Sequence, residues 1–357
     1  QEEETEVEDV DDSATEMFKM DVDSNEVLKP KPMKHPTADM LDQCMNLIFH
    51  FIKSVCFDEE ELKWDKTKLL YTDMTQIFEE IILPTHASHH VQFLMFYLIS
   101  FKNSLAYSFL QLLWRKVSNP NVPNILRQAS VLFMASLLAR AKFIPIIILK
   151  ENLTDMTQWI HGYISNQDGA TVNYDSRVHV VFYSVCQALF YLIAFRHKDL
   201  VNHNKGLIFL QGLNLAKIVT CHLNPLKVCL PAVTSNFASV TRHYQLAYCY
   251  SVIEHNARNT IPLVYRNSSG AAVMSMPVQL ETYFPFDPYL LQRSNHFINS
   301  LYREYDGSIP ESNGEDKKDE AEQQDTVKED EDDFLMDQSN NSLSSFSYGV
   351  SPGFLQM

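Results

Sequence analysis

Apolar residues recur at three- and four-residue intervals along almost the whole middle of the chain. Because this spacing places apolar side chains on one face of an α-helix, it predicts eight helices. They cover residues 40–55, 69–83, 91–101, 105–117, 125–141, 146–164, 178–195 and 246–253. The alternation typical of strands is nearly absent, and the nine glycines are few for a sheet-rich or nucleotide-cradling fold. The pattern therefore predicts an all-α chain.

The breaks between these segments are short and contain residues that do not readily continue a helix. They are Pro84, Pro145 and the stretches "NPNVP" (119–123), "NQDGA" (166–170) and "NP" (224–225). Asn103, Asn124 and Asp175 are candidate N-caps. Helix pairs with tight breaks, at a period of about 40 residues, favour a HEAT-like helical-repeat solenoid. A single irregular helical bundle is the alternative.

The longest apolar run, residues 178–195, approaches the length that crosses a membrane. It contains His179, Ser184 and Gln187, whose polar groups are costly in hydrocarbon. We therefore expect a helix buried on most sides, and no membrane association.

Charge is distributed unevenly along the chain, whose formal net charge is −16. Residues 1–29 hold 12 Asp or Glu against 2 Lys, and residues 304–337 hold 15 against 3. Such segments bury too little apolar surface to offset the entropy lost on ordering. We expect disordered acidic segments at 1–36 and 304–357 around a mildly basic helical domain at 37–303. The acidic segments either only solvate the protein, or bind partners and shield the basic domain from polyanions.

Catalytic signatures are missing from the sequence, which lacks the phosphate-loop, dinucleotide-binding, zinc-protease and nucleophile-elbow motifs. His86, His89 and His90 have a spacing compatible with metal binding, but no nearby Cys or carboxylate completes a ligand set. We therefore expect these histidines to cap and pack, and we expect no cofactor, no metal and no enzymatic activity.

The first distinctive segment, residues 112–145, is rich in cations, and no Asp or Glu occurs from residue 81 to residue 150. Its basic residues are Arg115, Lys116, Arg127, Arg140 and Lys142. One interpretation is that Arg140 and Lys142 complement the negative end of a helix dipole before Pro145. The other is that the cations form a docking edge for an acidic protein or a nucleic-acid backbone.

The second distinctive segment, which we call the strap, is "LETYFPFDPYLLQRSNHFI" (residues 280–298). Pro285 and Pro288 push the residues before them toward extended conformations, so the strap is expected to be stiff and non-helical. Its aromatic rings need cover. Either the strap seals the exposed end of the helical array, or it presents an aromatic anchor to a partner.

Several stretches, taken in order, resemble the family of RNA polymerase I-specific transcription initiation factors known as TIF-IA. They are "ILPTHASHHVQFLMFYLISF", "SLLARAKFIP", "FYSVCQALFYLIAFRHKDL", "LNPLKVCLPAV" and "FPFDPYLLQRS". The similarity runs from about residue 37 to 305, and the later "DEDDFL" is similar to the family's tail. The resemblance implies a HEAT-repeat fold and a noncatalytic role. Such a factor would bind RNA polymerase I at its stalk subunits and bridge it to the promoter selectivity factor.

The resemblance also implies site residues, nuclear and nucleolar localisation with shuttling to the cytoplasm, and control by regulatory kinases. The segment Leu138, Ala139, Arg140, Ala141 and Lys142 resembles the family segment implicated in selectivity-factor contact. Arg115, Lys116 and Arg127 are similar to a region proposed to contact DNA or a partner. Ser351, followed by Pro352, is like a regulatory serine near the family's C-terminus.

Family members are longer, and their extra sequence precedes the part that matches. The chain is therefore expected to be a C-terminal portion, with residues 1–29 forming an internal loop of the longer protein. The alternative function is that of a general helical-repeat adapter or nuclear transport scaffold without polymerase specificity.

Overall fold

The computed structural model describes residues 35–167, 175–258, 264–266, 272–274, 280 and 283–305. Ser351 and almost all of the two acidic segments, 1–36 and 304–357, lie outside the described residues, which include only residues 35, 36, 304 and 305 of those segments. The predicted domain limits therefore stay predictions.

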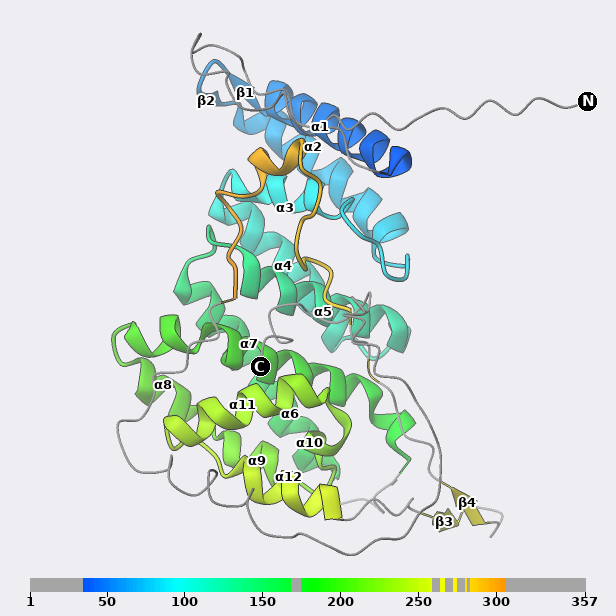
Figure 1. Ribbon diagram of the computed structural model, residues 1–357, viewed down its shortest axis with the longest axis vertical. Helices are drawn as coiled ribbons and strands as arrows, with labels where there is room; N and C mark the ends of the chain where they lie inside the picture. Colours follow the sequence, from blue (N-terminus) through cyan, green and yellow to red (C-terminus); the bar gives the residue numbers. More distant parts are fainter. Residues whose placement is uncertain are drawn as a thin grey trace, which may run out of the picture.

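Helices make up most of the described chain and form a stack (Figure 1). The helices are α1 (Pro36–Cys56), α2 (Trp64–Ile77), α3 (Phe93–Ser100), α4 (Asn103–Ser118), α5 (Asn124–Arg140), α6 (Ile146–Gln167), α7 (Val180–Asn202), α8 (Gly206–Gly212), α9 (Leu215–Val219), α10 (Pro225–Val228), α11 (Pro231–His243) and α12 (Cys249–Arg258). The π-helical turn η1 (Phe78–Ile82) continues α2, and the 3-10 turns are η2 (Ser176–His179) and η3 (Ser294–Phe297).

Two small antiparallel ladders complete the described structure. Strand β1 (Phe57–Asp58) pairs with β2 (Glu61–Leu62), with Phe57 opposite Leu62. Strand β3 (Val264–Arg266) pairs with β4 (Ala272–Met274), with Tyr265 opposite Val273. The all-α prediction is confirmed.

The predicted helices are present, but the periodicity missed α8, α9, α10 and α11. Three of them, α8, α9 and α10, have only four to seven residues, and each follows a residue with a left-handed backbone: Lys205, Asn214 and Asn224 have φ of 55°, 49° and 46°. Pro225, which we interpreted as a break, is the first residue of α10, where its fixed φ and missing N–H are tolerated.

One of the three predicted N-caps is confirmed, because the Asp175 side chain accepts a hydrogen bond from the Arg177 N–H at 3.1 Å. The other two predictions are wrong by one residue. Asn103 and Asn124 are the first helical residues, and Lys102 and Pro123 precede them without a side-chain cap.

The core of the stack is α7, which packs against α5, α6 and α11. Its most apolar window is long enough to cross a membrane, but 89% of that window is buried inside the protein. The predicted buried helix is therefore confirmed. Two polar side chains inside it form hydrogen bonds: the Tyr183 hydroxyl donates to the Leu223 carbonyl at 3.0 Å, and the Gln187 side chain accepts from the Leu230 N–H at 3.0 Å.

The strap runs along the stack instead of closing one end of it. Phe284 stacks on Tyr191 of α7, with ring centroids 4.1 Å apart. Phe286 contacts rings of α3 and α5, and Phe297 lies 5.2 Å from Phe49 of α1. Because these rings are buried against the middle and the N-terminal part of the stack, both predictions for the strap, an end cap and a partner-facing anchor, are wrong.

A buried carboxylate fixes the strap to the first helix. Asp42 of α1 is 1% exposed and accepts hydrogen bonds from the Arg293 N–H at 2.7 Å and the Ser294 N–H at 2.9 Å. The Ser294 hydroxyl also donates to it and lies 2.7 Å from the Tyr289 hydroxyl. These donors satisfy a charge that would otherwise be costly to bury.

Replacing Asp42 with Ala is expected to lower the free energy of unfolding by about 2–4 kcal/mol, because two buried N–H groups lose a charged acceptor. Urea unfolding followed by far-UV circular dichroism measures this change. Asp73→Ala, at an exposed position of α2, is the matched control. Equal unfolding midpoints for the two variants would show that the Asp42 contacts contribute no stability.

Candidate partner-binding surface

The segment Leu138–Lys142 lies at the C-terminal end of α5, where the chain after the strap returns. We call residues 299–305 the return segment. The Lys142 N–H donates to the Leu301 carbonyl at 2.9 Å, and the Arg303 N–H donates to the Arg140 carbonyl at 2.6 Å. The last turn of a helix leaves carbonyl groups without intrahelical partners. Here a distant part of the chain supplies a backbone donor to one of them.

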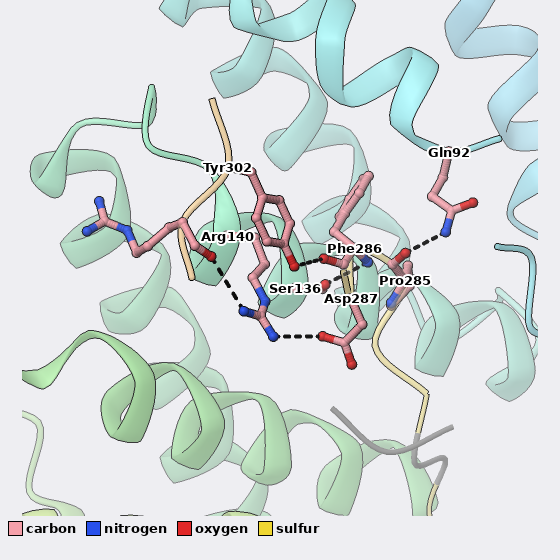
Figure 2. Close-up of polar contacts among 8 residues, drawn as sticks. Gln92, Ser136, Arg140, Pro285, Phe286, Asp287 and Tyr302 are labelled. Atoms are coloured by element: carbon pink, nitrogen blue, oxygen red, sulfur yellow. Dashed lines mark hydrogen bonds and ion pairs between the residues drawn. The ribbon is translucent and has the colours of Figure 1, made fainter. Parts of the chain in front are cut away.

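Arg140 points into the protein, with 3% of its surface exposed. Its Nη2 lies 3.2 Å from the Asp287 carboxylate, and its Nη1 lies 3.4 Å from the Arg303 carbonyl (Figure 2). The guanidinium carbon also lies 4.8 Å from the ring centroid of Phe195 and 5.4 Å from that of Tyr302. A buried charge needs partners of this kind to offset its desolvation.

Arg140 stays charged in this environment. Desolvation by burial opposes the charged form, but Tyr191, Tyr302 and Asp287 together raise the pKa of the guanidinium above its ordinary value. The strap itself is held beside it, because Phe286 donates its N–H to Ser136 Oγ at 2.8 Å and accepts from the Tyr302 hydroxyl at 2.9 Å (Figure 2). Arg140 therefore joins α5, the strap and the return segment.

The expectation that Arg140 lies on a docking edge does not hold in this fold. Leu138, Ala139 and Ala141 are fully buried, and Arg140 is nearly so, with the strap and the return segment bonded to Arg140. Lys142 is exposed. Within this segment, Lys142 is the residue whose charge faces solvent. The prediction that the segment contacts a partner is therefore kept for Lys142 alone.

A second ion network next to Arg140 was not anticipated from the sequence. Arg196 of α7, 3% exposed, donates to the Leu138 carbonyl and to Asp199, both at 2.6 Å. Burial is the main cause that lowers the pKa of Arg196, and nearby Arg303 acts in the same direction. Arg303 in turn lies 3.0 Å from Asp199. Asp199 thus stands between two guanidinium groups and links α7 to the return segment.

The other predicted basic residues lie at the opposite end of α5. Arg115 is exposed in the last turn of α4, whereas Lys116 forms an ion pair with Glu79 at 2.7 Å. Arg127 donates its Nε–H to the Val117 carbonyl at 2.8 Å. Lys116 and Arg127 therefore have structural partners, and Arg115 is the exposed member of the three.

The structure does not bring all the predicted basic residues together. Arg127 lies in the first turn of α5, and Lys142 follows its last turn. At a rise of about 1.5 Å per residue, the 15-residue interval between these positions corresponds to about 22 Å along the helix axis. There are thus two basic positions, one at each end of α5.

The histidine-containing loop packs onto the strap. His89 lies 5.1 Å from the Tyr283 ring, and His90 lies 5.5 Å from the Tyr289 ring. Burial is the main cause that lowers the pKa of His90. Within the described part of the chain, His, Cys, Asp and Glu form no group of three suited to hold a metal ion.

Comparison with known proteins gives consistent matches. The model of the family described as "RNA polymerase I specific transcription initiation factor RRN3" matches residues 1–311. The mouse factor RRN3 is 42% identical over 91% of this chain and 51% of its own length. A fission yeast relative is 26% identical over 79% of this chain and 46% of its own. The chain therefore spans about half the length of these relatives.

A crystal structure of RNA polymerase I transcription initiation factor Rrn3 resembles the present fold, with a TM-score of 0.66. The matched region covers 74% of this chain and 54% of the Rrn3 chain in that structure, and the two sequences are 23% identical. At this identity the likeness concerns the fold, which is helical and repeat-like.

Replacing Arg140 with Ala is expected to lower the free energy of unfolding by about 3–5 kcal/mol, because Asp287 loses its buried counter-ion. Lys142→Ala, two residues further on but exposed, is expected to change it by about 0.5 kcal/mol at most. Chemical denaturation of both variants measures the difference.

A double-mutant cycle tests the cause of that loss. Asp287→Ala combined with Arg140→Ala is expected to lose less stability than the sum of the single variants, because neither charge is then left unpaired. Strict additivity would show that the two side chains do not interact.

Proposed function

The chain belongs to the RNA polymerase I-specific transcription initiation factor family RRN3, and on that premise we propose that it acts in transcription initiation by RNA polymerase I. The observation that carries the proposal is the family match over residues 1–311, together with 42% identity to the mouse factor. The family consists of transcription factors and not of a known class of enzymes, in keeping with a noncatalytic role.

The mechanism we propose is bridging. One surface of the chain contacts RNA polymerase I, at its stalk subunits, and another contacts the promoter selectivity factor. A bridge needs two contact sites held at a constant separation. The exposed basic residues Arg115 and Lys142 meet this need, because they lie near opposite ends of α5, and α5 is packed between α4 and α7.

We assign Lys142 to the selectivity-factor contact and Arg115 to contact with DNA or a second acidic partner. Both cations are exposed and carry no ion pair in the described structure that would have to be broken. Their attraction to an acidic surface would mainly accelerate association and orient the partner.

Pull-down of purified RNA polymerase I and of the selectivity factor by the chain tests the bridge. Lys142→Glu is expected to weaken selectivity-factor binding about fivefold, equivalent to about 1 kcal/mol for an exposed ion pair, and to leave polymerase binding unchanged. Arg115→Glu is expected to leave selectivity-factor binding unchanged and to weaken binding to DNA or to the other acidic partner.

Lys217→Glu is the matched control, since Lys217 is an exposed lysine on α9, away from α5. Equal binding by Lys142→Glu and Lys217→Glu would remove Lys142 from the interface. Binding to neither partner, with capture of transport cargo or its GTPase instead, would contradict the bridge and support the helical-repeat adapter.

We further propose that the protein works in the nucleolus and that kinases regulate it at Ser351. A phosphate there would add about −1.5 to −2 charges to a tail that is already acidic. Mass spectrometry of the protein isolated from growing and from starved cells is expected to show different occupancy of Ser351. Equal occupancy in both states would argue against a regulatory role.

A further inference from the structure

Three segments of the chain enclose an apolar groove of about 300 Å³. This groove has no part in the proposed bridge between polymerase and selectivity factor. Its walls are the loop at residues 83–87, the first turns of α5 and the strap at Tyr283 and Pro285. Leu132 and Phe133 are among the buried residues that line it, and Ile125 at its rim is 70% exposed. This volume is at the lower end of the range for ligand clefts, about 300–1,000 Å³, so it suits one or two side chains of a peptide.

Contacts between the strap and residues 88–92, which directly follow the loop, fix the walls of the groove. The Tyr283 hydroxyl donates to the Ser88 carbonyl. The Gln92 side chain donates to the Pro285 carbonyl (Figure 2). Ala87 in the loop and His90 just after it have φ of 49° and 75°, a left-handed conformation that is costly for residues other than glycine. Such conformations persist only where the surroundings impose them, so the groove is formed before a ligand arrives.

The N-terminus of α5 favours an acidic ligand at the groove, and no carboxylate in the lining opposes one. None of the residues lining the groove is Asp or Glu. The whole stretch from residue 81 to residue 150 also contains no Asp or Glu. Helix α5 begins at the groove with Pro123 at the N-cap, without a side-chain cap and without an acidic residue in its first turn. Because the N-terminus of a helix carries partial positive charge, a carboxylate from outside would complement it. The groove therefore fits a peptide with an apolar anchor next to carboxylates.

One segment of this chain has that composition. Residues 329–336, "EDEDDFLM", place five consecutive acidic residues directly before Phe334, Leu335 and Met336. They lie outside the described residues, in a part of the chain that holds 15 Asp or Glu against 3 Lys between residues 304 and 337.

The connection to the described chain has a suitable length. The return segment is bonded to the C-terminal end of α5 through Arg303, and the groove is at the other end, one helix length or about 25 Å away. Residues 306–328 connect Tyr305 to the acidic segment, and 23 residues reach at most about 75–80 Å when fully extended, so the connection is long enough to span this distance.

We propose that residues 329–336 dock in this groove of the same chain, with Phe334 and Leu335 against its apolar lining and the preceding carboxylates at the N-terminus of α5. The docked segment occupies the groove and covers the exposed start of α5. This inference does not rest on the proposed role in polymerase initiation.

Photo-crosslinking of the full chain tests the proposal. With benzoylphenylalanine in place of Phe334, most intramolecular crosslinks are expected in residues 83–87 and 123–133, at a yield that does not depend on protein concentration. Benzoylphenylalanine in place of Phe346, in the same tail but beyond the acidic run, is the control and is expected to crosslink diffusely.

Variants of the groove make the test specific. Ile125→Asp is expected to reduce the groove crosslinks about tenfold, through loss of apolar contact and repulsion of the carboxylates. Ile147→Asp is the matched control, because Ile147 is 60% exposed in the first turn of α6 and lies outside the groove. Crosslinks that are spread over the whole surface, that join two copies of the chain, or that are equal in both variants would overturn the proposal.

Discussion

A guanidinium buried among apolar helices needs a counter-charge, and the path of the strap through this structure depends on the counter-charge that it supplies to Arg140. Its partner, Asp287, is 147 residues away in sequence. To reach Arg140, the strap must cross α5, and this path places Phe284 against α7 and Phe286 between α3 and α5. The cost of leaving either charge unpaired in a low-dielectric interior makes any other path of the strap unfavourable.

The strap gives a stack of helices contacts between elements that are not neighbours in sequence. Without it, each helical hairpin would contact mainly the hairpins before and after it, as in an open solenoid. Asp42 fastens the strap to α1, and Arg303 and Asp199 fasten the return segment to α7. The first helix and the central helix of the stack are thereby coupled, which suits the constant separation of contact sites that the proposed bridge requires.

Helix α5 is the element on which the proposed functions converge. Near one end are the exposed Arg115 and the apolar groove, and at the other are Lys142 and the return segment. The sides of α5 are buried against α4 and α7. In the functions proposed above, contacts with other molecules and with the chain's own tail are therefore confined to its two ends, and the packing of α5 keeps the spacing of those ends constant.

Local pattern determined the helices of this protein, because the period of apolar residues depends only on neighbours three and four positions away. It therefore located α4, α5, α6 and α7 and correctly buried the apolar run of α7, and five short stretches were enough to indicate the family. Helices α8, α9 and α10 have only four to seven residues, too few to show that period, and were missed, as was the 13-residue α11. What only the tertiary structure decided was the environment of each cation. Arg140 and Lys142 are two residues apart at the same helix end, yet one is buried beside Asp287 and the other is exposed. That difference comes from contacts between residues more than a hundred positions apart, which a local sequence pattern does not contain.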